Sequence, residues 1–145
     1  MVQNKILLVE DNEDDVELVE LALSSGLIAN QLDVVRDGAE ALDYLRCEGN
    51  FENRNSKEMP ALILLDLNLP KVNGLEVLKE IRSNEKTCLI PVTIFTSSDQ
   101  EKDIVESYKL GANSYIQKPV DFQKFKEAIQ QLGFYWLIFN KKPIN

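Results

Sequence analysis

Histidine is absent from this chain of 145 residues. Its absence excludes catalysis by a Ser–His or Cys–His pair and excludes metal sites that depend on imidazole ligands. Cysteine is nearly absent too, because Cys47 and Cys88 are the only two and stand far apart in the sequence. Two isolated cysteines cannot build a disulfide framework or a thiolate metal cluster, so we interpret both as reduced thiols without a functional role.

Long apolar stretches are also missing. No run approaches the roughly 20 apolar residues that a membrane-spanning helix requires. Residues 1–5 lead directly into a predicted strand and lack the pattern of a signal peptide. We therefore expect a cytoplasmic protein with no membrane partner.

Basic residues are in the minority. The chain has 16 Lys and Arg against 24 Asp and Glu, and its net charge is −8. A surface of this sign repels nucleic acid and anionic lipid, so we expect no nucleic-acid partner. The length suits one domain that can bury a substantial core.

Short apolar runs alternate with helical patterns along the chain. The runs predicted to be strands are residues 6–9, 32–35, 61–65, 92–96 and 114–117. A helical pattern follows each run, which predicts a succession of βα units. Right-handed crossovers then give an α/β fold with a doubly wound parallel sheet. We expect the strand order 2-1-3-4-5, with a functional site at the switch point between strands 1 and 3.

Helix ends are marked by polar residues and glycine. Asn12 is predicted to cap the first helix and Gly26 to end it. The segments Asp37–Glu40 and Ser98–Glu101 both have the spacing of a capping box, so each is predicted to open a helix. Gly111 is predicted to end the helix that Ser98–Glu101 opens.

Acidic residues follow two of the predicted strands. Asp66 ends the apolar run 61–65, which is typical of a strand buried on both faces, and Glu10 and Asp11 end the first run. Lys118 ends the last run. If these strands are parallel neighbours, three carboxylates and an ammonium converge at one edge of the sheet. This is the composition of a site that binds Mg²⁺ and in which a carboxylate accepts a phosphoryl group.

These residues carry a resemblance to a known family. The quoted motifs are Leu8-Val9-Glu10-Asp11, Asp66 with Pro70 and Gly74 after it, Thr96-Ser97, and Tyr115-Ile116-Gln117-Lys118-Pro119. In order and spacing they resemble the receiver domain of two-component response regulators over nearly the whole chain, which implies a flavodoxin-like fold. The start Val9-Glu10-Asp11-Asn12, the long loop before strand 3 and the aromatic C-terminal helix resemble the small receiver-only regulators that serve bacterial phytochrome histidine kinases.

The resemblance implies a role for each residue of the site. Asp66 would accept the phosphoryl group from a histidine kinase. Mg²⁺ would be held by Asp11, Asp66 and the carbonyl of Asn68, with Glu10 binding directly or through water. The phosphoryl group would be contacted by Lys118, which the resemblance places before a cis peptide at Pro119, and by the hydroxyl of Thr96. Tyr115 would move inward with Thr96 as a switch, or it is simply a half-buried aromatic of a strand.

The C-terminal segment carries more apolar residues than one helix face can bury. Six of them recur at intervals of three and four residues: Phe122, Phe125, Ile129, Leu132, Trp136 and Phe139. We expect a receiver domain over 1–133 and an extension of its last helix over 134–145. The exposed aromatics Phe134, Tyr135, Trp136 and Phe139 would contribute to a homodimer formed by the face of helix 4, strand 5 and helix 5. The alternative is that this helix end folds back on its own domain.

Two other functions share part of this pattern. Phosphatases of the haloacid-dehalogenase type also use a strand-end Asp with Thr, Lys and Mg²⁺, but they need an acid two residues after the nucleophile, where this chain has Asn68. A pseudo-receiver binds partners without phosphorylation, but it usually lacks the Asp or the Lys. The polar loop 48–58 is either a partner-contact loop or a surface insertion.

Overall fold

The computed structural model describes residues 5–24, 31–118, 121–141 and 143. It contains one parallel sheet in the order β2-β1-β3-β4-β5, as expected from the sequence. The strands are β1 (Lys5–Val9), β2 (Gln31–Val35), β3 (Leu62–Leu65), β4 (Val92–Thr96) and β5 (Ser114–Gln117). The predicted helix end at Gly26 and the cis peptide before Pro119 lie outside the described residues.

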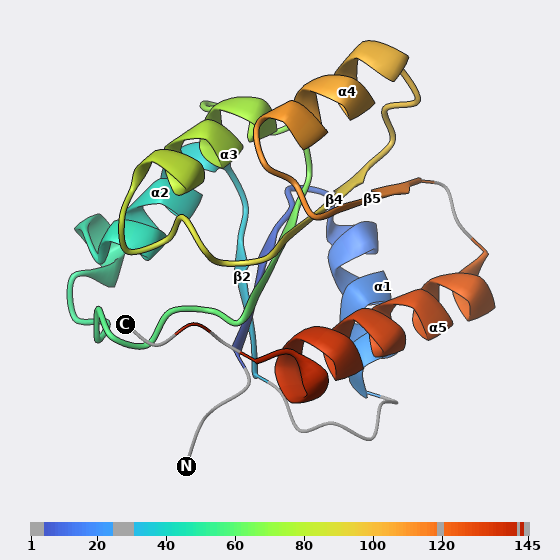
Figure 1. Cartoon of the computed structure of the whole chain (residues 1–145), viewed down its shortest axis with the longest axis horizontal. Coiled ribbons are helices and arrows are strands. Elements are labelled where there is room, and N and C mark those ends of the chain that lie inside the picture. Colours follow the sequence, from blue (N-terminus) through green and yellow to red (C-terminus); the bar gives the residue numbers. More distant parts are fainter. Residues whose placement is uncertain (1–4, 25–30, 119–120, 142, 144–145) are drawn as a thin grey trace.

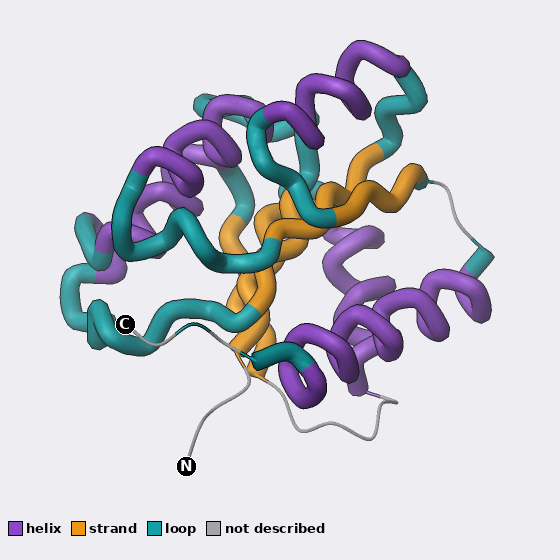
Figure 2. Tube along the Cα trace, viewed as in Figure 1, coloured by secondary structure: helices purple, strands orange, loops and turns teal. Residues whose placement is uncertain are grey.

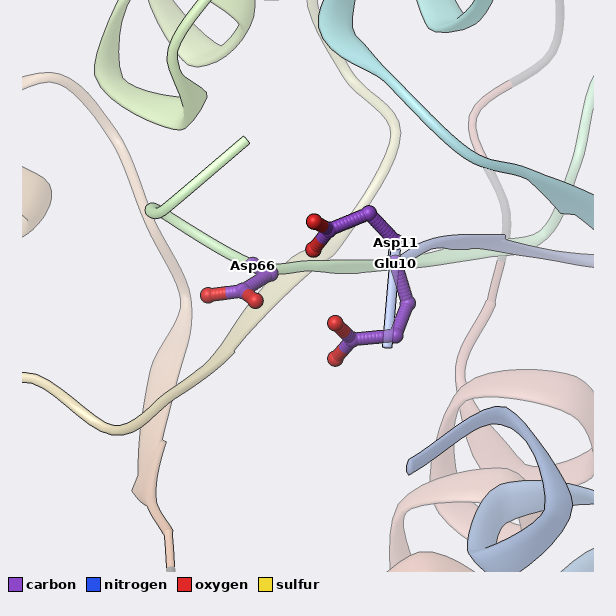
Figure 3. Close-up of side chains that lie close together, drawn as sticks. All are labelled: Glu10, Asp11 and Asp66. Atoms are coloured by element: carbon purple, nitrogen blue, oxygen red, sulfur yellow. The ribbon is translucent and has the colours of Figure 1, made fainter. Parts of the chain in front are cut away.

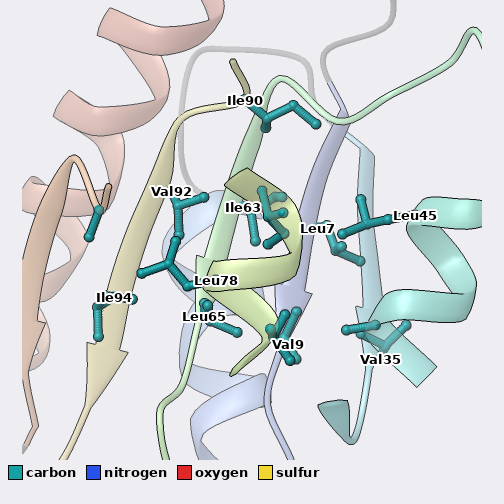
Figure 4. Close-up of a cluster of buried hydrophobic side chains, with 14 of the residues drawn as sticks. Leu7, Val9, Val35, Leu45, Ile63, Leu65, Leu78, Ile90, Val92 and Ile94 are labelled. Atoms are coloured by element: carbon teal, nitrogen blue, oxygen red, sulfur yellow. The ribbon is translucent and has the colours of Figure 1, made fainter. Parts of the chain in front are cut away.

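Helices cover both faces of the sheet (Figures 1 and 2). One face carries α2 (Gly38–Arg46), α3 (Gly74–Ser83) and α4 (Glu101–Lys109), and the other carries α1 (Glu13–Ser24) and α5 (Phe122–Gly133). Because side chains alternate along a strand, each central strand contributes to two cores. In β1, Leu7 and Val9 pack under α2 and α3 (Figure 4), whereas Ile6 and Leu8 pack under α1 and α5. All residues of β1, β3 and β4 are buried, which explains why their sequences are apolar except at Lys5, Thr93 and Thr96.

The helix starts follow the sequence signals with one exception. Asn12 accepts a hydrogen bond from the backbone N–H of Asp15, and Asp37 accepts one from Glu40, as predicted for caps. The capping box predicted at Ser98–Glu101 is wrong. The Ser98 hydroxyl donates instead to the carboxylate of Asp103, and α4 starts after Gln100 without a side-chain cap. The helix does end just before Gly111, which has φ +101°.

The polar loop before β3 is fastened to the domain. It contains the short 3₁₀ helix η1 (Gly49–Phe51), and the guanidinium of Arg54 lies 3.8 Å from the ring centroid of Tyr44. Arg54 also donates to the backbone oxygens of Tyr44 and Glu58, at 2.8 Å each. These contacts show how the insertion is held, and a partner for its outer surface stays a prediction.

The last helix continues into the π-helical segment η2 (Phe134–Phe139). The wider π turn rotates the apolar residues relative to a regular helix, so that Leu137 is buried on the α1/α5 side. The expectation that Trp136 lies outside the domain is wrong, because its side chain is partly buried against the same core. Phe134, Tyr135 and Phe139 are exposed as expected, the last by 69%. Among the described helices, none has the length and hydropathy needed to cross a bilayer.

Candidate functional site

The acidic residues meet at the C-terminal ends of β1 and β3. These strands are neighbours with Val9 level with Leu65, so Glu10 and Asp66 leave the sheet side by side. The chain then turns to opposite faces, into α1 after β1 and into α3 after β3, which is the topological switch point of the sheet. One carboxylate oxygen each from Glu10, Asp11 and Asp66 lies within 4.8 Å of the others (Figure 3).

Backbone contacts fix the two buried acids. The N–H of Asp66 donates to the oxygen of Val9 at 3.1 Å, and the N–H of Glu10 donates to Val35 at 3.0 Å. One carboxylate oxygen of Asp66 accepts the N–H of Asn68 at 3.1 Å, which holds the loop after β3 against the acid. At Gly74 a Cβ would lie 2.3 Å from the backbone oxygen of Asp66, so only glycine permits this close approach of α3. The loop geometry therefore explains the glycine that the sequence motif contains.

Lys118 lies in the centre of the acidic cluster. Its Nζ donates to Glu10 at 2.6 Å, to Asp15 at 2.8 Å and to Asp66 at 3.3 Å, and its side chain is 11% exposed. Burial lowers the pKa of this ammonium, but the hydrogen bonds to Asp15 and Glu10 and the charge of Asp66 outweigh it, so the pKa is raised. Lys118 therefore stays charged and supplies a fixed cation at the rim of the sheet.

The sequence reasoning missed Asp15 as a member of this site. The sequence pattern places Asp15 only in the predicted first helix, whose first turn follows strand 1 directly. A helix that starts at the carboxyl end of a strand places its first turn beside the same rim. The position of Asp15 in this first turn was therefore a sequence signal that could have placed it in the site.

Glu10 has the most perturbed acidity of the cluster. Its side chain is fully buried, and burial raises the pKa of its carboxyl to about 7 against the hydrogen bond from Lys118, with the charge of Asp66 adding to the rise. A neutral carboxyl and a carboxylate are thus both accessible near neutral pH. A second cation near Glu10 would favour the carboxylate.

The polar residues that follow β3 and β4 complete the site. The Asn68 amide donates to the hydroxyls of Thr96 at 3.4 Å and Ser97 at 3.5 Å. Thr96 is fully buried, and its backbone oxygen accepts the N–H of Lys118 at 2.7 Å. The hydroxyl of Tyr115 donates to the backbone oxygen of Ser98 at 3.0 Å, so this ring is tied to the loop that follows Ser97. The structure thus brings Asn68, Thr96 and Lys118 together, whereas the switch role of Tyr115 stays a prediction.

The donor set fits a hard divalent cation. Three carboxylates offer oxygen ligands from two adjacent strand ends, and the exposed Asp11 leaves one side of the cluster open to water. Mg²⁺ and Mn²⁺ prefer oxygen ligands and retain water molecules in protein sites. Neither thiol belongs to the cluster, which disfavours soft metals at this place.

The chain is similar to known proteins in sequence and in structure. The family model described as "Response regulator receiver domain" matches residues 6–130. The chain is 41% identical over 132 residues to the response regulator Rcp1 of Synechocystis sp., covering 91% of this chain and 88% of Rcp1. It is 38% identical over 138 residues to the probable methanogenesis regulatory protein FilR2 of Methanothrix harundinacea, covering 95% and 86% of the two chains.

Solved structures give the same result. The phosphorylated cyanobacterial phytochrome response regulator RcpA matches with a TM-score of 0.88 and 41% identity, covering 98% of this chain and 99% of that one. The Mn²⁺-bound form of Rcp1 matches with a TM-score of 0.86 and 39% identity, covering 97% and 99%. The bacteriophytochrome response regulator RtBRR matches with a TM-score of 0.79 and 52% identity, covering 97% and 84%.

Proposed function

This chain belongs to the response regulator receiver domain family, and we propose that Asp66 is the residue on which it accepts a phosphoryl group. The observation that carries this assignment is the place of Asp66. It is a buried carboxylate at the end of the central strand β3, with the ammonium of Lys118 at 3.3 Å and two further acids beside it.

The reaction needs a carboxylate nucleophile and a cation that balances the incoming charge. An Asp66 oxygen attacks the phosphorus of a phosphohistidine, the P–N bond breaks, and its electron pair stays on the nitrogen of the departing imidazole. The product is an acyl phosphate. Lys118 is placed to offset charge on the phosphoryl oxygens, and the Thr96 hydroxyl lies at the neighbouring strand end, where it can donate to one of them.

Receiver domains bind a divalent metal, and we propose Mg²⁺ for this one. Asp11, Asp66 and the carbonyl of Asn68 would hold it, with Glu10 at the buried side directly or through water. When bound, the metal supplies positive charge to the phosphoryl oxygens. The Mn²⁺-bound form of Rcp1 supports a cation of this type at the acidic cluster. The same residues would also assist hydrolysis of the acyl phosphate, so the domain would assist both its own phosphorylation and its own dephosphorylation.

The partner proposed for this domain is a histidine kinase of the phytochrome type. The support is similarity to RcpA, a cyanobacterial phytochrome response regulator, and to RtBRR, a bacteriophytochrome response regulator. The location we propose is the cytoplasm. The acidic surface, with a net charge of −8, supports a protein partner over nucleic acid or a membrane.

Residues 1–133 are proposed as the receiver domain and 134–145 as an extension that joins two copies. Exposed apolar side chains on α4 and on the C-terminal segment support a homodimer: Val105, Tyr108, Phe134, Tyr135, Ile138 and Phe139. They lie on α4 and on the end of α5 with η2, so a partner covering them would form the face that the sequence predicted. Trp136 contributes indirectly, because its partly buried side chain packs the extension against the α1/α5 core.

Intact mass spectrometry after incubation with acetyl phosphate and Mg²⁺ tests the assignment. We expect the wild-type chain to gain one phosphoryl mass, and Asp66→Asn to gain none, because the amide cannot act as the nucleophile. Asp14→Asn is the matched control, since it removes one exposed acid in the first turn of α1 and should be modified as the wild type is. Chelation of Mg²⁺ should suppress the reaction. A phosphoryl adduct on Asp66→Asn would contradict the assignment.

A further inference from the structure

Asp15 brings a fourth carboxylate to the phosphoacceptor site. It comes from α1, whereas the other acids come from the ends of β1 and β3. Its Oδ2 accepts a hydrogen bond from Lys118 Nζ at 2.8 Å, which is shorter than the 3.3 Å between Lys118 and Asp66. Its side chain is 24% exposed, so the contact is partly shielded from water. Asp15 does not belong to the group of carboxylates whose oxygens cluster within reach of one metal ion.

A closed ring of hydrogen bonds fixes the position of Asp15. The backbone N–H of Asn12 donates to Glu10 Oε2 at 3.2 Å, and the N–H of Asp15 donates to the Asn12 side chain at 3.1 Å. Lys118 closes the ring by donating to both Glu10 and Asp15. Asp15 is therefore held by the start of α1 itself, and its carboxylate is also favoured by the helix N-terminus.

The ammonium of Lys118 has no donor to spare in this state. An ammonium group has three N–H donors, and Lys118 directs them to Glu10, Asp15 and Asp66. On its other side Nζ lies 4.7 Å from the ring centroid of Phe95. To contact a phosphoryl oxygen, Lys118 must give up one carboxylate.

The three carboxylates that accept hydrogen bonds from Lys118 differ in whether a metal ion or a phosphoryl group also engages them. Glu10 and Asp66 are the two that a divalent cation would draw toward Asp11, and such a cation would also repel the ammonium of Lys118. Asp66 is in addition the proposed site of modification. Asp15 is the partner of Lys118 that neither the cation nor the phosphoryl group requires.

We propose that Asp15 is a positioning residue for phosphoryl transfer, which retains the Lys118 ammonium at the rim of the sheet when metal and phosphoryl group engage Glu10 and Asp66. This inference rests on the proposed function of Asp66. Asp15 acts through Lys118 and does not itself touch the phosphoryl group. Without it, the ammonium loses its one anchor on α1 and moves under the repulsion of the cation.

The rate of phosphorylation at saturating Mg²⁺ provides the first test. Asp15→Asn should lower the rate constant with acetyl phosphate about tenfold, equivalent to about 1.4 kcal/mol. Asp14→Asn makes the same change of charge in the same helical turn, and its rate should stay within roughly twofold of the wild type because exposed charges are screened. Asp15→Glu should restore part of the rate, since it returns a carboxylate to the same turn.

A second arm asks whether Asp15 acts through Lys118. In a Lys118→Gln background the Asp15→Asn change should have no further effect on the rate, because the group it positions is gone. A readout without turnover is the side-chain ammonium signal of Lys118 in ¹⁵N-detected NMR. Under Mg²⁺ titration that signal should persist in the wild type and in Asp14→Asn and broaden in Asp15→Asn, as hydrogen exchange with water becomes faster.

Equal rates for Asp15→Asn and Asp14→Asn, or an unchanged ammonium signal in Asp15→Asn, would overturn the inference. An effect of Asp15→Asn that persists undiminished in Lys118→Gln would overturn it as well, because Asp15 would then act by another route. These outcomes leave the proposed function standing. If the wild-type chain itself acquires no phosphoryl group, the assignment of Asp66 fails instead.

Discussion

Glu10 shows how strongly one buried position can change the chemistry of a residue. The sequence places a glutamate at the end of the first strand, but only burial raises the pKa of its carboxyl from 4.5 to about 7. The folded chain therefore keeps a proton on Glu10 that the unfolded chain releases between these two pH values. Because the folded state binds more protons there, the free energy of unfolding that depends on Glu10 falls as the pH rises through this window and levels off above it.

The variant Glu10→Gln isolates this contribution. Its amide stays neutral at every pH. In urea unfolding with a chelator present, the free energy of unfolding of the variant should therefore rise relative to that of the wild type between about pH 4.5 and 7. The gain should amount to about 1–3 kcal/mol, in keeping with a shift of this size. Asp14→Asn, which removes an exposed acid from the first turn of α1, is the control variant. A difference between Glu10→Gln and wild type that does not vary with pH would show that Glu10 is ionised alike in both states.

At the scale of the elements, the start of α2 is fitted tightly to the loop that follows β3. The N–H of Gly38 donates to the backbone oxygen of Pro70 at 3.3 Å, and a Cβ on Gly38 would lie 1.8 Å from the backbone oxygen of Val72. The same loop contains Asn68, whose backbone N–H donates to the carboxylate of Asp66. The packing of α2 thus supports the geometry of the site from one side.

Gly38→Ala should therefore destabilise the protein although alanine favours helix. We expect a loss of about 1–3 kcal/mol in the free energy of unfolding, because the backbone of the loop has to move. Gly133→Ala is the matched control on α5, where the added Cβ would meet a side-chain carbon at 3.9 Å, an ordinary contact. It should be neutral or stabilising by up to about 1 kcal/mol. Denaturant titrations of both variants measure these free energies of unfolding. Equal stability of the two variants would contradict the tight fit of Gly38 against the loop.

At the scale of the whole molecule, four large apolar side chains are exposed within one short C-terminal segment. The end of α5 and η2 expose Phe134, Tyr135, Ile138 and Phe139, while Leu137 and Trp136 anchor the same segment on the α1/α5 core. One side of this segment packs on the core of its own domain, and its other side is apolar and exposed. Such a surface is suited to contact a second copy of the chain.

The double variant Phe134→Ser/Phe139→Ser tests this arrangement and leaves the buried anchor intact. Loss of two aromatic contacts should raise the dissociation constant of the homodimer at least about tenfold, or about 1.4 kcal/mol. Leu21→Ser removes an exposed leucine from α1, an element outside the proposed face, and should leave the dimer unchanged. Sedimentation equilibrium gives both constants. A wild-type chain that is monomeric at tens of micromolar, with or without phosphorylation, would refute the dimer.

The sequence alone determined the fold and the place where the acidic residues meet Lys118. Alternating apolar runs and helical patterns predicted the strand order, and the acids after two strands together with Lys118 predicted where the site lies, because parallel strands end at one edge. These signals are local, so the sequence itself contains them. The cap at Asn12 was predicted for the same reason, since its partner is three residues away.

Tertiary structure decided the contacts between distant segments. The hydrogen bond between Asp15 and Lys118 joins residues 103 positions apart and depends on how α1 is rotated over the sheet, which no local pattern records. Ser98 failed as a cap because Asp103 competes for its hydroxyl once the loop is folded. Trp136 is partly buried because the C-terminal segment packs on the α1/α5 core and does not project beyond it. Periodicity fixes which elements form, but the free energy of packing sets the rotation of each helix, and that rotation selects which side chains meet.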